Sequence, residues 1–159
     1  TWGNGVRRMV SWVHFRDRVT GRTFYFWNTH LDHEVQAARE RSAELIRQRI
    51  GRLPTDSRLF LVGDFNSVAA ANRTYDILTK EAGLTDTWSA ARERRNEDAN
   101  SFTGFGPLRH DGERIDWILA RGAMDVRATE VVTFRHGDQW PSDHLPVVAW
   151  ITLRQAPDQ

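Results

Sequence analysis

Apolar and aromatic residues alternate with polar ones at the start of the chain and predict a β-hairpin. The segments 8–16 (RMVSWVHFR) and 23–29 (TFYFWNT) are rich in β-branched and aromatic residues, which favour extended backbone. Between them lies the polar segment 17–22 (DRVTGR), which contains one glycine and is typical of a turn. We therefore expect two antiparallel strands joined by a short connection.

The residues after the hairpin have the spacing of an amphipathic helix. Asp32 and Glu34 mark its expected start and Gly51 its end. The residues that recur at helical spacing and fall near one face are Ala38, Ser42, Leu45, Ile46, Arg49 and Ile50. This pattern predicts one amphipathic helix that packs a single face against a sheet.

A second, shorter helix is predicted over residues 72–82. Tyr75, Leu78 and Ala82 fall on one stripe, and Gly83 follows as a stop. Before it, the apolar run 58–63 (RLFLVG) is typical of a central buried strand.

The rest of the chain predicts three more strands after a long surface loop. The loop is the polar segment 88–114, and the strands are 114–119, 126–134 and 146–153. Six strands and two helices indicate an α+β fold, with sheets packed face to face and helices outside.

Composition restricts the class of protein more than its function. The chain has 159 residues, 40% of them hydrophobic, which is enough for one domain with a real core. It has no stretch of roughly 18 apolar residues that could span a membrane. The absence of cysteine excludes disulfides, thiolate zinc sites and cysteine nucleophiles. The compartment stays open, since a chain without cysteine suits a reducing and an oxidising environment equally.

Charge gives no support for binding long nucleic acid. Lys and Arg number 22 and Asp and Glu number 21, so the net charge is only +1. A nuclease is not excluded, because positive charge can gather in one cleft. The chain starts without Met and without a signal peptide, and we expect it to be cut from a longer sequence.

Polar residues follow the second and third predicted strands. Asn28 and His30 are two apart in extended backbone and share a face, where they could contact a phosphoryl oxygen or form an ordinary polar pair. Asp64 comes directly after the buried strand, and Asn66 follows it. These oxygen donors suit a hard cation such as Mg²⁺, or else they simply form a turn.

Two further motifs lie near the last strands. Asp116 stands inside an apolar strand, where it needs a partner: an arginine, or a histidine whose tautomer it fixes. Asp143 and His144 precede Pro146, in a polar turn or at a functional site. The loop 101–112 borders this region, and Phe102 could stack on a substrate or only anchor the loop.

The motifs around Asn28–His30, Asp64–Asn66, Asp116 and Asp143–His144 occur in one order that resembles the endonuclease/exonuclease/phosphatase superfamily. The resemblance spans His14 to Leu153. It implies half of a four-layered α/β/β/α sandwich with two facing, mostly antiparallel sheets. The amino-terminal half of the family domain, with its metal-binding Glu and an early Asn, has no counterpart in residues 1–159.

The resemblance also implies roles for individual residues. The catalytic set is Asp64, Asn66, His144, Asp116 and His30. Asn28, His30 and Asn66 are implied to bind substrate. The implied ligands of Mg²⁺ or Mn²⁺ are Asp143, Asp64, Asn66 and His144.

These observations predict a divalent-metal-dependent phosphoester hydrolase in which water attacks in line with the leaving group. The expected substrate is a small-molecule, lipid or nucleotide phosphoester, and the expected partner is the missing half of the domain. One alternative is a nuclease that acts on single-stranded nucleic acid. Another is a binding module that kept the fold and lost the reaction, and activity of these residues alone is doubtful.

Overall fold

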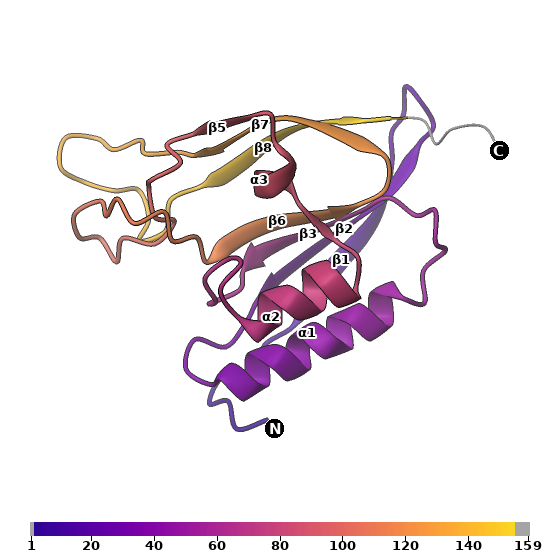
Figure 1. Ribbon diagram of the computed structural model, residues 1–159, viewed down its shortest axis with the longest axis horizontal. Coiled ribbons are helices and arrows are strands. Elements are labelled where there is room, and N and C mark those ends of the chain that lie inside the picture. The colour runs from indigo at the N-terminus through magenta and orange to yellow at the C-terminus, as the bar shows by residue number, and fades with distance from the viewer. Residues whose placement is uncertain (1, 155–159) are drawn as a thin grey trace.

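The computed structural model describes residues 2–154 as two β-sheets that face each other, with the longest helix on the outer side of the larger sheet (Figure 1). Residue 1 and residues 155–159 of the predicted domain lie outside this part. The strands are β1 (Val10–Arg16), β2 (Thr23–His30), β3 (Leu59–Asp64), β4 (Thr85–Asp86), β5 (Glu93–Arg95), β6 (Asp116–Arg121), β7 (Met124–Val131) and β8 (Val147–Leu153). The helices are α1 (Gln36–Ile50), α2 (Arg73–Asp76), the π-helix η1 (Ile77–Glu81) and α3 (Thr87–Ala90).

The sheets have the orders β1-β2-β3-β6-β4 and β5-β7-β8. Four neighbouring pairs are antiparallel, and only β2–β3 and β5–β7 are parallel. The expected α+β class with mostly antiparallel facing sheets is thus confirmed. Because β2 and β3 are parallel and β6 is antiparallel to β3, the ends of β2 and β3 meet the start of β6 at one edge.

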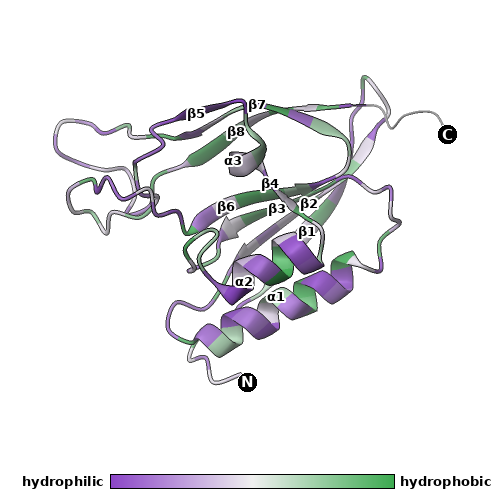
Figure 2. Cartoon of the chain, in the orientation of Figure 1, coloured by the Kyte–Doolittle hydropathy of each residue, from purple (hydrophilic) through white to green (hydrophobic). Residues whose placement is uncertain are grey.

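The larger core lies between the five-stranded sheet and the helices α1, α2 and η1. It contains Trp27, Leu61 and Ile46, and Phe65 stacks on Trp117 with ring centroids 4.2 Å apart. Hydrophobic residues run along β3 and β6, whereas α1 and α2 carry both hydrophobic and polar residues (Figure 2). Within residues 2–154, no helix combines the length and the apolar content that crossing a bilayer requires.

Helix α1 begins later than the sequence pattern indicates. Asp32 does not start the helix; its carboxylate accepts hydrogen bonds from the backbone N–H groups of Glu34 (2.9 Å) and Val35 (2.6 Å), which forms a turn before Gln36. The predicted end at Gly51 is confirmed.

The predicted second helix is helical but not uniform, since η1 replaces its second half. The prediction of a loop over 88–114 is wrong in part. Asp86 caps α3 by accepting a hydrogen bond from the Trp88 N–H, and β5 pairs with β7. β5 is wholly polar, so no apolar pattern marks it. β7 ends at Val131, three residues before the predicted end.

Strand β1 lies at the edge of its sheet and exposes apolar residues on both faces. Trp12, Val13 and Phe15 have exposed fractions of 57%, 50% and 45%, and Met9, just before the strand, is 73% exposed. A groove of about 480 Å³ runs between β1 and α1, and its lining includes Leu45, which the helical pattern placed on the packed face but which is 42% exposed. Apolar side chains of β1 and α1 are therefore exposed to solvent on this side of the molecule.

Candidate active site

Three predicted site residues lie in one row across neighbouring strands. His30 at the end of β2 pairs in register with Asp64 at the end of β3, and Asp64 pairs with Asp116 at the start of β6. Side chains at matched positions of adjacent strands share a face of the sheet. The topology therefore brings together residues that are far apart in the sequence.

Asp64 is the central acceptor of this row. One oxygen, Oδ2, lies 3.2 Å from His30 Nε2 and 3.7 Å from His144 Nε2. Its other oxygen, Oδ1, accepts a hydrogen bond of 2.8 Å from the backbone N–H of Asn66. The Asn66 amide donates to Asp64 Oδ2 and to the Leu31 carbonyl, while its backbone adopts a φ of 47°. A left-handed conformation in a residue other than glycine is often retained at functional sites.

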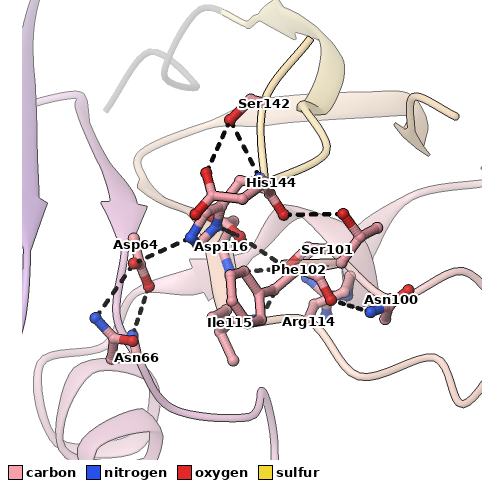
Figure 3. A network of polar contacts seen from close by, with 12 residues as sticks. Asp64, Asn66, Asn100, Ser101, Phe102, Arg114, Ile115, Asp116, Ser142 and His144 are labelled. Carbon is pink, nitrogen blue, oxygen red and sulfur yellow. Dashed lines mark hydrogen bonds and ion pairs between the residues drawn. The ribbon is translucent and has the colours of Figure 1, made fainter. Parts of the chain in front are cut away.

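His144 reaches the same row from the loop before β8 (Figure 3). Its Nδ1 lies 2.9 Å from Asp116 Oδ2, so Nε2 is left to face Asp64. A carboxylate on Nδ1 fixes the tautomer and the orientation of an imidazole. Of the two partners considered for Asp116, an arginine or a histidine, the structure shows a histidine, His144.

Burial and neighbouring charge act on this pair in opposite ways. Burial lowers the pKa of His144, but the hydrogen bond to Asp116 and the charges of Asp116, Asp64 and Asp143 outweigh it and raise the pKa above the ordinary 6.5. Burial also raises the pKa of the Asp116 carboxyl, although hydrogen bonds with His144 and Ser101 favour its charged form. His144 therefore stays protonated to a higher pH than a free histidine.

Sequence reasoning missed Ser101. Its hydroxyl donates a 2.8 Å hydrogen bond to Asp116 Oδ2, and the residue is fully buried. It lies in the segment predicted as a surface loop, where a serine is ordinary. Only its place directly before Phe102, in the loop that borders the site, linked it to the other motifs.

Asp64, Asp116 and His144 line a cavity of about 470 Å³ between the two sheets. Its lining comprises Phe26, Val62, Gly63, Asp64, Asp116, Trp117, Ile118, Ser142, His144, Leu145, Pro146 and Val147. Apolar side chains form most of this wall, and Asp64, Asp116 and His144 supply its titratable groups. Such a mixture is typical of small-molecule sites.

Phe102 packs beside His144. The two ring centroids are 4.8 Å apart, and Phe102 is 39% exposed (Figure 3). Arg109 and His110 of the same loop are each ion-paired with a nearby aspartate. Both side chains therefore already have partners within residues 88–114.

Two predicted site residues, Asn28 and Asp143, take no part in the hydrogen bonds that join the row. Asn28 pairs with Val62 on the face that carries His30, two positions back, and among residues 2–154 its side chain forms no hydrogen bond. Asp143 accepts hydrogen bonds from the backbone of Thr103 through its carbonyl, and its carboxylate contacts the Ser142 hydroxyl at 3.3 Å. The substrate role of Asn28 and the metal role of Asp143 stay predictions.

The described part of the chain shows no ready-made cluster of metal ligands. Across residues 2–154, no group of three or more His, Asp or Glu side chains is arranged to hold a metal ion. Asp64 has the oxygen chemistry that Mg²⁺ prefers, but both of its oxygens already have partners. The metal roles of Asp64, Asn66, Asp143 and His144 therefore stay predictions.

Solved structures of similar fold extend over most of this chain. A mannosyl-6-phosphatase from Bacteroides thetaiotaomicron is 30% identical, with a TM-score of 0.85 over 96% of this chain and 60% of that one. An endonuclease/exonuclease/phosphatase from Bacteroides vulgatus is 29% identical, with a TM-score of 0.86 over 96% and 58%. This chain thus spans about 60% of the length of both proteins.

A more distant likeness shows the fold alone. Beta toxin from Staphylococcus aureus, solved with bound magnesium ions, is 14% identical, with a TM-score of 0.57 over 90% of this chain and 57% of that one. No curated protein matches the sequence. Residues 2–144, however, match the sequence model of the Endonuclease/Exonuclease/phosphatase family. The chain therefore belongs to the endonuclease/exonuclease/phosphatase family.

Proposed function

We propose that the protein to which this chain belongs hydrolyses a phosphoester by attack of water. The observation that carries the proposal is that Asp64, Asp116 and His144 line one cavity, with His30 3.2 Å from Asp64. Two carboxylates and two imidazoles within contact distance can bind, orient and protonate a phosphoryl group. Family membership agrees with this chemistry.

Each residue has a distinct part in the proposed reaction. Asp64 orients the attacking water and accepts its proton, because its Oδ2 faces the cavity between the two imidazoles. His144 donates from Nε2 to the phosphoryl oxygens, where negative charge develops in the transition state. Asp116 orients the His144 ring and favours its doubly protonated form, which donates from Nδ1 to Asp116 and from Nε2 to the phosphoryl group.

A small phosphoester is the substrate class that we favour. The cavity has the volume of a small-molecule site, and the net charge of +1 gives long nucleic acid no general attraction. The 30% identical neighbour is a mannosyl-6-phosphatase, and a sugar phosphate is therefore the first substrate to test.

We also propose that the reaction depends on a divalent cation held jointly with residues beyond this chain. The neighbour beta toxin carries magnesium, and this chain covers only about 60% of its similar structures. Removing the cation with EDTA is expected to abolish turnover, and Mg²⁺ or Mn²⁺ is expected to restore it. Full turnover in EDTA would contradict the metal requirement without touching the roles of Asp64 and His144.

The test uses the complete protein with mannose 6-phosphate, p-nitrophenyl phosphate and single-stranded DNA as alternative substrates. We expect Asp64→Asn and His144→Gln each to lower kcat about a hundredfold or more. Asp111→Asn and His110→Gln are matched controls, because these residues lie in ion pairs outside the cavity. Near-normal turnover in Asp64→Asn or His144→Gln would exclude the mechanism.

A non-catalytic binding module is the competing function. It predicts that the complete protein binds a phosphate compound but shows no turnover of any of the three substrates with either metal. Substrate cleavage that exceeds the rate without protein, and that Asp64→Asn removes, would exclude this alternative.

A further inference from the structure

Ser101 is buried at a point where three parts of the chain meet. Its hydroxyl accepts hydrogen bonds from the backbone N–H groups of Ile115 (3.0 Å) and Asp116 (3.2 Å). The same hydroxyl donates to Asp116 Oδ2 at 2.8 Å. Two lone pairs and one proton are all that a serine hydroxyl possesses, and here each has a partner.

This arrangement determines where the hydroxyl proton goes. Because both neighbouring amides can only donate to Oγ, the O–H is left to donate to the carboxylate of Asp116. Asp116 Oδ2 then receives Ser101 on one side and His144 Nδ1 on the other. Rotation of the carboxylate would break both hydrogen bonds at once.

The backbone of Ser101 adds a second link. Its carbonyl accepts a 2.8 Å hydrogen bond from the N–H of Leu145, the residue that follows His144. Ser101 thus contacts Asp116 through its side chain and the His144 loop through its main chain. Figure 3 shows Ser101 beside Asp116 and below His144.

We propose that Ser101 is a positioning residue that holds the Asp116 carboxylate and the His144 loop in the arrangement required for phosphoester hydrolysis. The inference rests on the proposed function for its effect on turnover. Its structural part, an ordered His144–Asp116 pair, does not depend on any substrate.

The experiment compares Ser101→Ala with Thr87→Val in the complete protein. Thr87 is a suitable control, because it is also buried and its hydroxyl donates to the Ile118 carbonyl of β6 at 2.9 Å without contacting Asp116. We expect Ser101→Ala to lower kcat for the best substrate about tenfold to a hundredfold, since a small displacement of a catalytic group has effects of this size. Thr87→Val is expected to keep kcat within about threefold, a limit set by its lack of contact with the site.

A double-mutant cycle separates positioning from general damage to the fold. If Ser101 acts through Asp116, then Ser101→Ala causes no further loss of kcat in an Asp116→Ala background. A multiplicative loss in that background would show that Ser101 acts independently of Asp116 and would overturn the inference.

Proton NMR gives a readout without substrate. We expect a downfield, slowly exchanging His144 Nδ1 proton in the wild type, assigned by its absence in His144→Gln. Ser101→Ala should lose this resonance by exchange with solvent, and Thr87→Val should keep it. Retention in Ser101→Ala would refute the positioning role. If the wild type cleaves none of the substrates, the proposed function fails while this measurement still decides the role of Ser101.

Discussion

The His144 imidazole lies between two carboxylates that affect it differently. Asp116 contacts Nδ1 at 2.9 Å, whereas Asp64 Oδ2 is 3.7 Å from Nε2, beyond hydrogen-bond distance. The first carboxylate therefore orients the ring, and the second acts through its charge. A substrate or water between Asp64 and His144 would contact both groups, which is the position that general acid–base chemistry requires.

This arrangement predicts that Asp116→Asn lowers the pKa of His144. The substitution removes the charge of Asp116 and weakens its hydrogen bond, both of which raise the pKa in the wild type. The pKa is measured by NMR from the Cε1 proton shift of His144 across the pH range. An unchanged pKa in Asp116→Asn would contradict the assignment of Asp116 as the dominant partner.

The same pKa predicts a pH-dependent contribution to stability. The pKa of His144 is raised in the folded state above the value of 6.5 that it has in the unfolded chain. The contribution of His144 to stability is therefore fully present below pH 6.5 and is lost as the pH rises through the folded-state pKa. The difference in free energy of unfolding between wild type and His144→Gln should therefore be larger at about pH 5.5 than at about pH 8.5. Urea unfolding at both pH values measures it.

At the scale of residues, the sequence predicted the site where polar groups interrupt apolar strands. Asp116 is recognisable because a charged residue inside an apolar strand needs a partner. Asp64 is recognisable because it directly follows a buried strand and, with Asn66, supplies oxygen donors. Ser101 is not, since a serine in a loop carries no such signal. The left-handed backbone of Asn66 was also hidden, because it follows from the turn after β3.

Gly63 determines how closely β2 and β3 approach at the site. Its φ is +142°, and a Cβ atom at this position would lie 1.8 Å from the Thr29 carbonyl oxygen. The added Cβ would clash with a backbone atom, so no side-chain rotation can relieve the clash. Since Asp64 follows directly, the close approach of the strands also positions the central carboxylate beside His30.

We therefore expect Gly63→Ala to reduce the free energy of unfolding by about 3 kcal/mol or more. Gly83→Ala is the matched control, because its φ is +67° but nothing lies within 4 Å of an added Cβ. Gly83→Ala should reduce the free energy of unfolding by only about 1 kcal/mol, because alanine disfavours a positive φ but meets no other atom there. Urea unfolding compares the two variants, and equal losses would show that the contact with Thr29 is unimportant.

At the scale of elements, prediction succeeded where apolar periodicity was strong and failed where it was absent. The hairpin, α1 and β3 follow from their residue patterns. β5 is polar and exposed, and it exists because β7 offers a neighbouring strand. The short helix α3 depends on the Asp86 cap within a segment that otherwise lacks helical periodicity.

At the scale of the molecule, the α+β class could be predicted from the number and type of elements, but the order of strands could not. The parallel pairing of β2 with β3 and the place of β6 beside β3 arise from tertiary packing around Phe65 and Trp117. That order assembles the site. Periodicity indicates the elements but not which residues meet, and the resemblance of the motifs to a known family indicated the residues of the site.

The uncovered edge of β1 has a consequence for the whole molecule. An exposed, apolar edge strand offers unpaired backbone groups and hydrophobic surface to another chain. We expect these 159 residues alone to self-associate as concentration rises, detected by sedimentation velocity. Val13→Lys should reduce association, since a charge on the face shared with Phe26 and Phe15 opposes sheet extension.

Val19→Lys is the control, because Val19 is 94% exposed in the β1–β2 turn and contributes no edge surface. It adds the same charge, so any general effect of net charge on association appears in both variants. A monomeric wild type over the whole concentration range would show that β1 does not recruit a second chain. Equal reduction by both variants would assign the association to charge and not to the edge of the sheet.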